Sequence, residues 1–272
     1  MPKHAYGWVP DLPDHRDFLF SAPLENLASL PTSVDLRQQC PKEVYDQGQL
    51  GSCTANAIAG ALEFEQMKQG LKTFTPSRLF IYYNERVIEH TVNTDSGAQV
   101  RDGIKSVGNI GAPPERDWPY DISKFAHKPP QVPAYKEAPL GKALQYQRVP
   151  QVLNQMKGCL ASGYPFVYGF TVYESFESDQ VAKIGVVPMP AAGEKVLGGH
   201  AVVAVGYDDA SQRFISRNSW GPGWGMAGYF TIPYAYLTDS NLADDFWTVR
   251  LVAKTAAQLA AEKAAAAMAA RP

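Results

Sequence analysis

The chain has 272 residues, and its 25 Lys and Arg against 27 Asp and Glu give a formal net charge of −2. Without a basic excess or a Lys/Arg run to neutralise phosphates, we expect no nucleic-acid partner. No uninterrupted apolar stretch approaches the ~20 residues that span a bilayer, so we expect no membrane span. The 22 Gly and 21 Pro favour a loop-rich fold with β structure over a helical bundle.

Residues 1–29 are expected to form an irregular extension. Pro10 and Pro13 stand too close together for a helix or a central strand. The aromatic residues Tyr6 and Trp8 favour docking on the body of the protein over free disorder. The first eight residues lack the apolar core of a signal peptide, so we expect a cytoplasmic protein or export by a non-classical route.

Three regions favour helices before the middle of the chain. Thr54 to Gln69 is rich in Ala, Leu, Met, Glu and Gln, and Gly70 stands where a helix C-cap is expected. Pro76 to Glu89 and Gly97 to Gly108 are the other two. Prolines then recur from Gly111 to Pro139, which predicts a connector between a helical subdomain, 30–138, and a β subdomain, 139–253.

The second half carries strand signals after one short helix at Gln151 to Ala161. The run Ala201 to Val205 is apolar at every position, as in a strand buried on both faces. Helices first and strands second indicate the α+β class. The Ala-rich tail, 254–272, is expected to be a frayed surface helix or disordered. The expected strands are Pro165–Tyr173, Ala201–Tyr207, Arg213–Arg217, Gly228–Ile232 and Phe246–Val252.

The three cysteines are Cys40, Cys53 and Cys159, so at least one thiol is free. A bridge between Cys40 and Cys159 is conceivable, and two buried small hydrophobic residues are the plainer alternative. Cys53 stands at the head of the first predicted helix, where backbone N–H groups stabilise a thiolate and so favour a nucleophile. By itself, a buried structural cysteine fits that position equally well.

Two further positions suit proton transfer. His200 follows two glycines at the edge of the buried strand, and its side chain titrates near neutrality. Asn218 ends a later strand, before a Gly-rich loop that contains Trp220 and Trp224. Asn218 could orient the His200 ring, and the tryptophans could screen that bond from water. Taken singly, each has a structural alternative: a hydrogen-bonding histidine and a Trp/Gly loop packed for stability.

Together these segments resemble the papain-like cysteine peptidases, family C1. The likeness rests on Gln47 to Cys53, on His200, and on Asn218-Ser-Trp-Gly with its following Gly-Trp-Gly. Segments 30–37 and 115–120 are similar to the start of a mature enzyme and to the end of its helical half. The resemblance implies a two-subdomain fold, with a helical half, a β-barrel-like half and the cleft between them.

The resemblance assigns roles by position. Cys53 becomes the nucleophile, His200 its base and later its acid, and Asn218 the group that orients His200. Gln47 and the Cys53 N–H become the oxyanion hole. The reaction implied is peptide-bond hydrolysis through a thioester, without a cofactor or metal, on protein or peptide substrates, by an enzyme expected to be monomeric.

The resemblance also implies substrate-binding positions. Ser96, Gly97 and Ala98 are similar to the strip that pairs with substrate backbone, and a specificity pocket is expected around a second group. The small residues of that group predict a roomy, uncharged pocket that takes an apolar or bulky P2 side chain. The second group is Gly169, Gly198, Gly199 and Ala201, with Trp220 nearby.

Two departures and one extension qualify the resemblance. Thr54 replaces the aromatic residue usual after the nucleophile, and Leu50 replaces a common disulfide cysteine, which points to a divergent, microbial branch. Residues 1–29 could lie over the cleft and restrain activity until cleavage near Leu30, as in a zymogen, or could be a permanently docked arm. A thiol-dependent acyl transferase or amidase, and a non-catalytic peptide-binding homologue, are the alternative functions.

Overall fold

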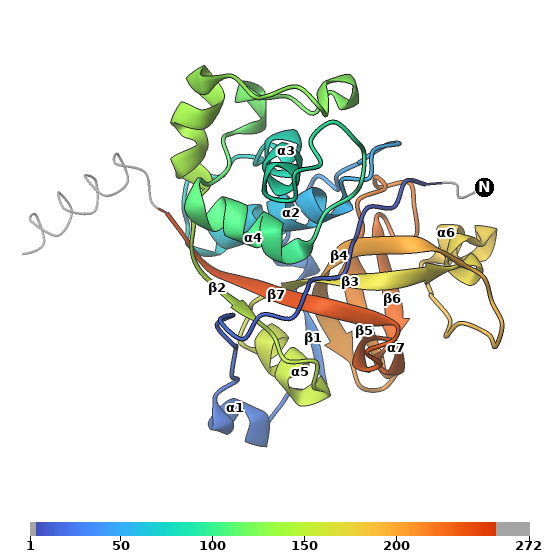
Figure 1. Ribbon diagram of the computed structural model, residues 1–272. Helices are drawn as coiled ribbons and strands as arrows, with labels where there is room; N and C mark the ends of the chain where they lie inside the picture. The colour runs from blue at the N-terminus through green and yellow to red at the C-terminus, as the bar shows by residue number, and fades with distance from the viewer. Residues whose placement is uncertain (1–3, 254–272) are drawn as a thin grey trace, which may run out of the picture.

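The computed structural model describes residues 4–253, and the predicted tail at 254–272 lies outside them. Three helices form one layer (Figure 1): α2 (Cys53–Lys68), α3 (Arg78–Ile88) and α4 (Val100–Asn109). Each overlaps a helix predicted from sequence. The end of α2 follows the predicted chemistry, because Gly70 has φ +63° and its N–H donates to the Met67 carbonyl.

The second layer is one antiparallel sheet of seven strands in the described residues. Its strand order is β2-β7-β3-β4-β5-β6, and β1 pairs with β4. The sheet is open, so the expectation of a β-barrel-like half was wrong, while the α+β class is confirmed. The strands are β1 (Ser33–Asp35), β2 (Ala143–Arg148), β3 (Phe166–Tyr173), β4 (Val196–Asp208), β5 (Arg213–Arg217), β6 (Tyr229–Pro233) and β7 (Ala243–Val252).

The core lies between these layers. Helix α2 packs on β4, and the run Ala201 to Val205 is buried at every residue, as its composition predicts. The sequence analysis did not predict β1 or the mostly polar β2, because neither strand shows an alternation of apolar and polar residues. The other α-helices of the described residues are short: α1 (Leu24–Ala28), α5 (Leu153–Ala161), α6 (Asp179–Ile184) and α7 (Tyr234–Thr238). None of the helices within 4–253 is long and apolar enough to cross a membrane.

The N-terminal extension lies against the body of the protein. In Figure 1 the dark blue segment runs from the N-terminus between the helical layer and strands β3 and β4, then turns towards α1. Trp8, Phe20 and Ala22 are buried, and Trp8 forms a parallel bridge with Ala98. Residues of the extension therefore belong to the junction of the two layers.

Candidate active site

Cys53 is the first residue of α2 and is fully buried. Its sulfur lies within reach of the backbone N–H groups of Thr54, Ala201 and Gly7. Ala201 directly follows His200 on β4, so the helix start and the strand bring the two predicted partners to one place. Burial dominates the thiol's titration and raises the pKa of Cys53 to about 12.

His200 is held by Asn218 in a defined orientation. The Asn218 Oδ1 lies 2.8 Å from His200 Nε2 and accepts from the Ser219 N–H at 2.9 Å. Because a backbone N–H can only donate, this atom is the amide oxygen, and His200 Nε2 must carry the proton. His200 Nδ1 has no hydrogen-bond partner among the described residues. Its lone pair is therefore free to accept a proton.

Aromatic rings enclose this pair. The Trp220 ring stacks on His200 with centroids 4.8 Å apart, and Phe170 and Phe176 stand at 5.8 and 6.4 Å. Burial in this apolar setting lowers the pKa of His200 to about 4, although the bond to Asn218 opposes the shift. In the covered site, both shifts favour a neutral thiol and a neutral imidazole over an ion pair.

Gln47 is fixed in the loop before α2. Its Oε1 accepts from the Ser219 hydroxyl at 2.7 Å, and its backbone N–H donates to the Ser219 carbonyl at 2.9 Å. This leaves Nε2 as the outward donor, at 2.9 Å from the Leu50 carbonyl oxygen and 3.2 Å from that of Ala5. A carbonyl of the extension therefore sits at the amide that the resemblance assigns to the oxyanion hole.

The extension covers the other predicted positions as well. The amides of Gly7 and Trp8 donate to the Gly199 carbonyl at 3.1 and 2.9 Å. Ala98 donates to the Gly7 carbonyl at 2.7 Å and accepts from Val9 at 3.1 Å. The predicted backbone-pairing residue Ala98 thus pairs with the chain's own N-terminal segment.

Close approach explains the glycines at these positions. An added Cβ at Gly97 would lie 2.2 Å from the Gly7 oxygen, and one at Gly198 would lie 2.9 Å from the Tyr6 ring. Ser96 is more remote, since its hydroxyl bonds to Thr91 at 2.9 Å.

Trp8 fills a pocket at the second group of predicted residues. An added Cβ at Gly169 would lie 2.0 Å from the Trp8 ring, and one at Gly199 would lie 2.8 Å from it. The indole Nε1 donates to the buried carboxylate of Asp245 at 2.9 Å. A buried carboxylate therefore lies beside the residues around which a roomy, uncharged pocket was expected. Asp245 belongs to β7, and its partners are too distant in sequence for a motif to reveal it.

The sequence analysis did not single out three side chains near the site: Glu177, His4 and Glu85. Glu177 accepts from the Tyr6 hydroxyl and lies 3.4 Å from His4 Nδ1, while the His4 ring stacks on Trp220. Glu85 is fully buried beside α2 and accepts from the Thr54 hydroxyl at 2.9 Å. Burial raises the pKa of Glu85 well above its usual value. Thr54 therefore has a polar partner that an aromatic residue at its position would lack.

The other two cysteines lie apart from Cys53. Cys40 and Cys159 are buried and free, so the conceivable bridge between them is absent. Within residues 4–253, no group of three or more His, Cys, Asp and Glu side chains is arranged to hold a metal ion.

Comparisons with known proteins decide the family. The sequence pattern of the family described as papain family cysteine protease matches residues 30–245, most of the chain. The chain belongs to the papain family of cysteine proteases. It is thus a cysteine peptidase of the hydrolase class, and proteins are its substrates.

Individual relatives agree with this family. The crystal structure of xylellain, a cysteine protease from Xylella fastidiosa, is 45% identical, covers 93% of this chain and 98% of its own, and superimposes with a TM-score of 0.86. A protein of Acanthamoeba polyphaga mimivirus described as peptidase C1-like is 42% identical over 91% of this chain and 87% of its own length. Procathepsin L of Rattus norvegicus is 28% identical over 79% of this chain, which spans 63% of that protein.

Proposed function

We propose that this papain-family peptidase cuts peptide bonds with Cys53 as nucleophile, His200 as base and acid, Asn218 as the residue that orients His200, and Gln47 as oxyanion donor. The arrangement of His200 carries the proposal. Its Nε2–H is committed to Asn218, and its unpaired Nδ1 stands beside the residue whose N–H meets the Cys53 sulfur. A buried nitrogen lone pair on the residue that precedes this N–H suits general-base activation of the buried thiol.

The proposed reaction proceeds in two halves. His200 Nδ1 takes the Cys53 proton, and the thiolate attacks the substrate's carbonyl carbon. The developing oxyanion accepts from Gln47 Nε2 and from the Cys53 N–H. The C–N bond then breaks, His200 protonates the departing amine, and a thioester remains. Water gives a proton to His200 and attacks the thioester, which releases the acid and restores the thiol.

We also propose that the extension keeps the enzyme inactive. The support is steric: Ala5 supplies the carbonyl at Gln47, the Gly7 backbone lies beside the thiol while its N–H donates to Gly199, and Trp8 fills the adjoining pocket. Burial under the extension also favours the neutral thiol, which is the less reactive form.

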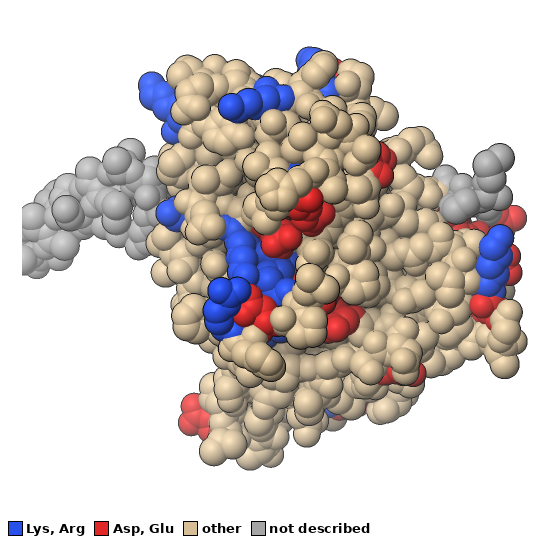
Figure 2. All heavy atoms as spheres, viewed as in Figure 1, with Lys and Arg blue, Asp and Glu red and all other residues tan. Residues whose placement is uncertain are grey.

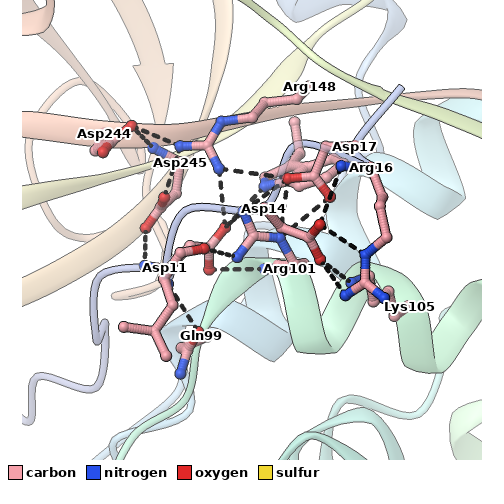
Figure 3. Close-up of polar contacts among 12 residues, drawn as sticks. Asp11, Asp14, Arg16, Asp17, Gln99, Arg101, Lys105, Arg148, Asp244 and Asp245 are labelled. Carbon is pink, nitrogen blue, oxygen red and sulfur yellow. Dashed lines mark hydrogen bonds and ion pairs between the residues drawn. The ribbon is translucent and has the colours of Figure 1, made fainter. Parts of the chain in front are cut away.

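Ion pairs fasten the extension to the body, and we call this set of contacts the latch (Figure 3). Asp11 and Asp17 of the extension meet Arg101 of α4 and Arg148 at the end of β2. The shortest pair joins Arg101 Nη2 and Asp17 Oδ2 at 2.6 Å, and both side chains are at most 5% exposed. Figure 2 shows positive and negative side chains meeting on this face of the molecule.

The alternative functions, a transferase or amidase and a non-catalytic peptide-binding homologue, predict different products. A transferase or amidase would pass the thioester's acyl group to an amine or act on a non-peptide amide. A peptide-binding homologue would bind without turnover. The family match favours hydrolysis of proteins.

A full-length Trp8→Ala chain tests the proposal, because it empties the pocket and leaves the four proposed catalytic residues in place. We expect this chain to hydrolyse a peptide library to free acids, and Cys53→Ser in the same background to be inactive. Turnover that persists in the Cys53→Ser chain would contradict the proposal. Product amides with added amines would indicate the transferase.

A further inference from the structure

Asp11 of the latch occupies a carboxylate site that the body of the protein builds. None of its side chain is exposed, and each of its two oxygens accepts from an N–H group of the body. Oδ1 accepts from the Arg101 backbone N–H at 3.0 Å, and Oδ2 accepts from the Trp247 indole N–H at 3.1 Å. Trp247 is buried as well, so its indole N–H depends on an acceptor that reaches it inside the protein.

The first of these two donors belongs to the start of α4. This helix begins at Val100, and its N-cap residue, Gln99, makes no side-chain hydrogen bond to the helix. The first N–H groups of a helix lack acceptors within the helix and lie at its positive end, so a carboxylate is a favoured partner. Asp11, 90 positions before Arg101, supplies that carboxylate, and it belongs to a segment that has to leave before a substrate binds.

The charges beside this site balance, so hydrogen-bond donors and not net charge carry its recognition. Arg148 Nη1 and Arg101 Nη2 lie 3.6 and 4.0 Å from the Asp11 Oδ2 (Figure 3). Two carboxylates of the body, Asp244 and Asp245, lie 2.9 and 3.1 Å from Arg148 Nη2. Two body cations thus stand against two body anions.

Departure of the extension would take the acceptors from several donors of the body. The Trp247 indole N–H and the Arg101 backbone N–H would lose Asp11. The Arg101 guanidinium would lose Asp17 and the Leu12 carbonyl, to which it donates in the docked state. A buried donor without an acceptor is costly, so a ligand that restores the acceptors gains affinity.

We propose that the vacated surface is an acid-selective subsite, in which the Arg101 N–H and the Trp247 indole N–H bind an aspartate of the protein substrate. The inference rests on the proposed function and names a substrate class for it. The donor pattern explains the choice of a carboxylate, because its two oxygens both accept, as those of Asp11 do. A carboxamide has one acceptor oxygen and would turn its NH₂ group against the second donor.

The path of the extension places this subsite relative to the scissile bond. The Gly7 backbone lies beside the Cys53 thiol, Trp8 fills the next pocket, and Asp11 stands three positions beyond Trp8. The pocket of Trp8 is the one expected to take the P2 residue, which precedes the scissile bond. A substrate that follows the same groove would therefore place its aspartate about three residues to the amino-terminal side of P2.

Binding of a peptide tests the subsite without catalysis. The full-length chain with Trp8→Ala and Asp11→Ala lacks the two side chains that fill the pocket and the carboxylate site. The probe is a labelled peptide with the sequence of residues 9–19, followed by fluorescence anisotropy, beside the same peptide with Asp11→Asn. We expect the Asp peptide to bind about 10-fold more tightly, because hydrogen bonds to a charged group are lost in the Asn peptide. Equal binding of the two peptides would overturn the proposal.

One substitution in the protein then isolates the indole donor. Trp247→Phe keeps an aromatic ring and removes the N–H, so it should reduce the advantage of the Asp peptide to about threefold or less. Trp118→Phe is the matched control, because the Trp118 indole N–H has no acceptor within residues 4–253, and the advantage should persist. If Trp247→Phe does not fold, Arg101→Met removes the guanidinium and should also lower the advantage. An unchanged advantage in the folded variants would refute the assignment.

Cleavage completes the test in the same full-length chain with Trp8→Ala and Asp11→Ala. Library peptides with Asp three positions before P2 should exceed those with Asn about 10-fold in kcat/KM, and Trp247→Phe should remove most of this ratio. Equal cleavage of the two sets, or a preference for Asn, would contradict the proposal. If no peptide is cleaved, the proposed function fails, and the binding measurements still decide whether the subsite exists.

Discussion

Gly7 is the point at which the extension is most sensitive to a small change. An added Cβ there would lie 1.7 Å from the Gly51 carbonyl oxygen and 2.4 Å from its carbon, both backbone atoms. No rotamer change relieves a backbone contact, so the segment must move by more than 1 Å, since real Cβ contacts start near 3.0 Å. Such a shift breaks three hydrogen bonds: those of Gly7 and Trp8 to Gly199, and that of Ala98 to Gly7.

Gly7→Ala is therefore expected to release the extension. Three hydrogen bonds at about 1 kcal/mol each amount to about 3 kcal/mol. That figure corresponds to about 100-fold in the docking equilibrium. Peptide hydrolysis by the full-length chain measures the effect, with exchange at residues 7 to 9 as a check on release. Gly223→Ala is the control, because its Cβ would meet nothing within 4 Å. If exchange shows that the extension is released but peptide hydrolysis is no faster than in the parent chain, the inhibitory role of the extension is refuted.

Three further predictions concern the oxyanion donor, the latch and its pH dependence. In the Trp8→Ala chain, Gln47→Ala should lower kcat by about 10²- to 10³-fold with little change in KM, whereas exposed Gln49→Ala should not. Arg101→Ala should weaken docking by about 2 to 5 kcal/mol, seen as faster exchange at residues 7 to 9, because it removes the shortest ion pair of the latch and leaves the buried Asp17 with Arg148 alone, at 3.7 Å. Arg116→Ala, whose side chain is 73% exposed, is its control. Burial raises the pKa of Asp11, and burial together with repulsion from Asp11 raises that of Asp245 to about 7, so these two carboxyls bind more protons in the docked state than in the free state. The lowered pKa of His200 acts in the opposite direction below about pH 6.5, so the effect of Asp245 is measured as the difference between the parent and the Asp245→Asn chain. The charged groups that face the pair are Arg101, Arg148, Asp17 and Asp244. As the pH rises from about 5 to 7, docking of the parent, followed by anisotropy of an N-terminal dye, should weaken relative to that of the Asp245→Asn chain, by up to about 10-fold per unit. A parent that gains strength relative to Asp245→Asn over that range, or no difference between the two chains, would contradict the assignment.

Local sequence patterns predict the elements that position the site. The helix expected at Thr54 to Gln69 is α2, Cys53–Lys68, because its composition and its C-cap are both local signals. The strand expected at Arg213–Arg217 is β5 with the same bounds. The open sheet departs from the expected barrel because closure depends on which strands meet at the edges. That pairing joins residues far apart in the chain, such as Ala143 with Val252.

Site residues that are brought together by contacts between distant parts of the chain cannot be predicted from a single sequence. Asp245 serves the pocket through a bulge in β7 and through a contact with Trp8, 237 positions earlier. No spacing rule links such residues. The docking of Tyr6 and Trp8, in contrast, was predictable, since aromatic residues in a proline-rich segment need a surface to bury them. What docking does to Cys53 and His200 follows only from the burial that the fold creates.

Labelling of Cys53 by an epoxide-type thiol trap tests the central claim most directly. In the full-length Gly7→Ala chain, we expect one adduct at Cys53, formed much faster than in the parent chain and lost with His200→Ala. Trp8→Ala should behave in the same way if Gly7→Ala does not fold. Absence of labelling in both released chains, or an adduct at Cys40 or Cys159 instead, would contradict the assignment of Cys53 as a nucleophile that the extension covers.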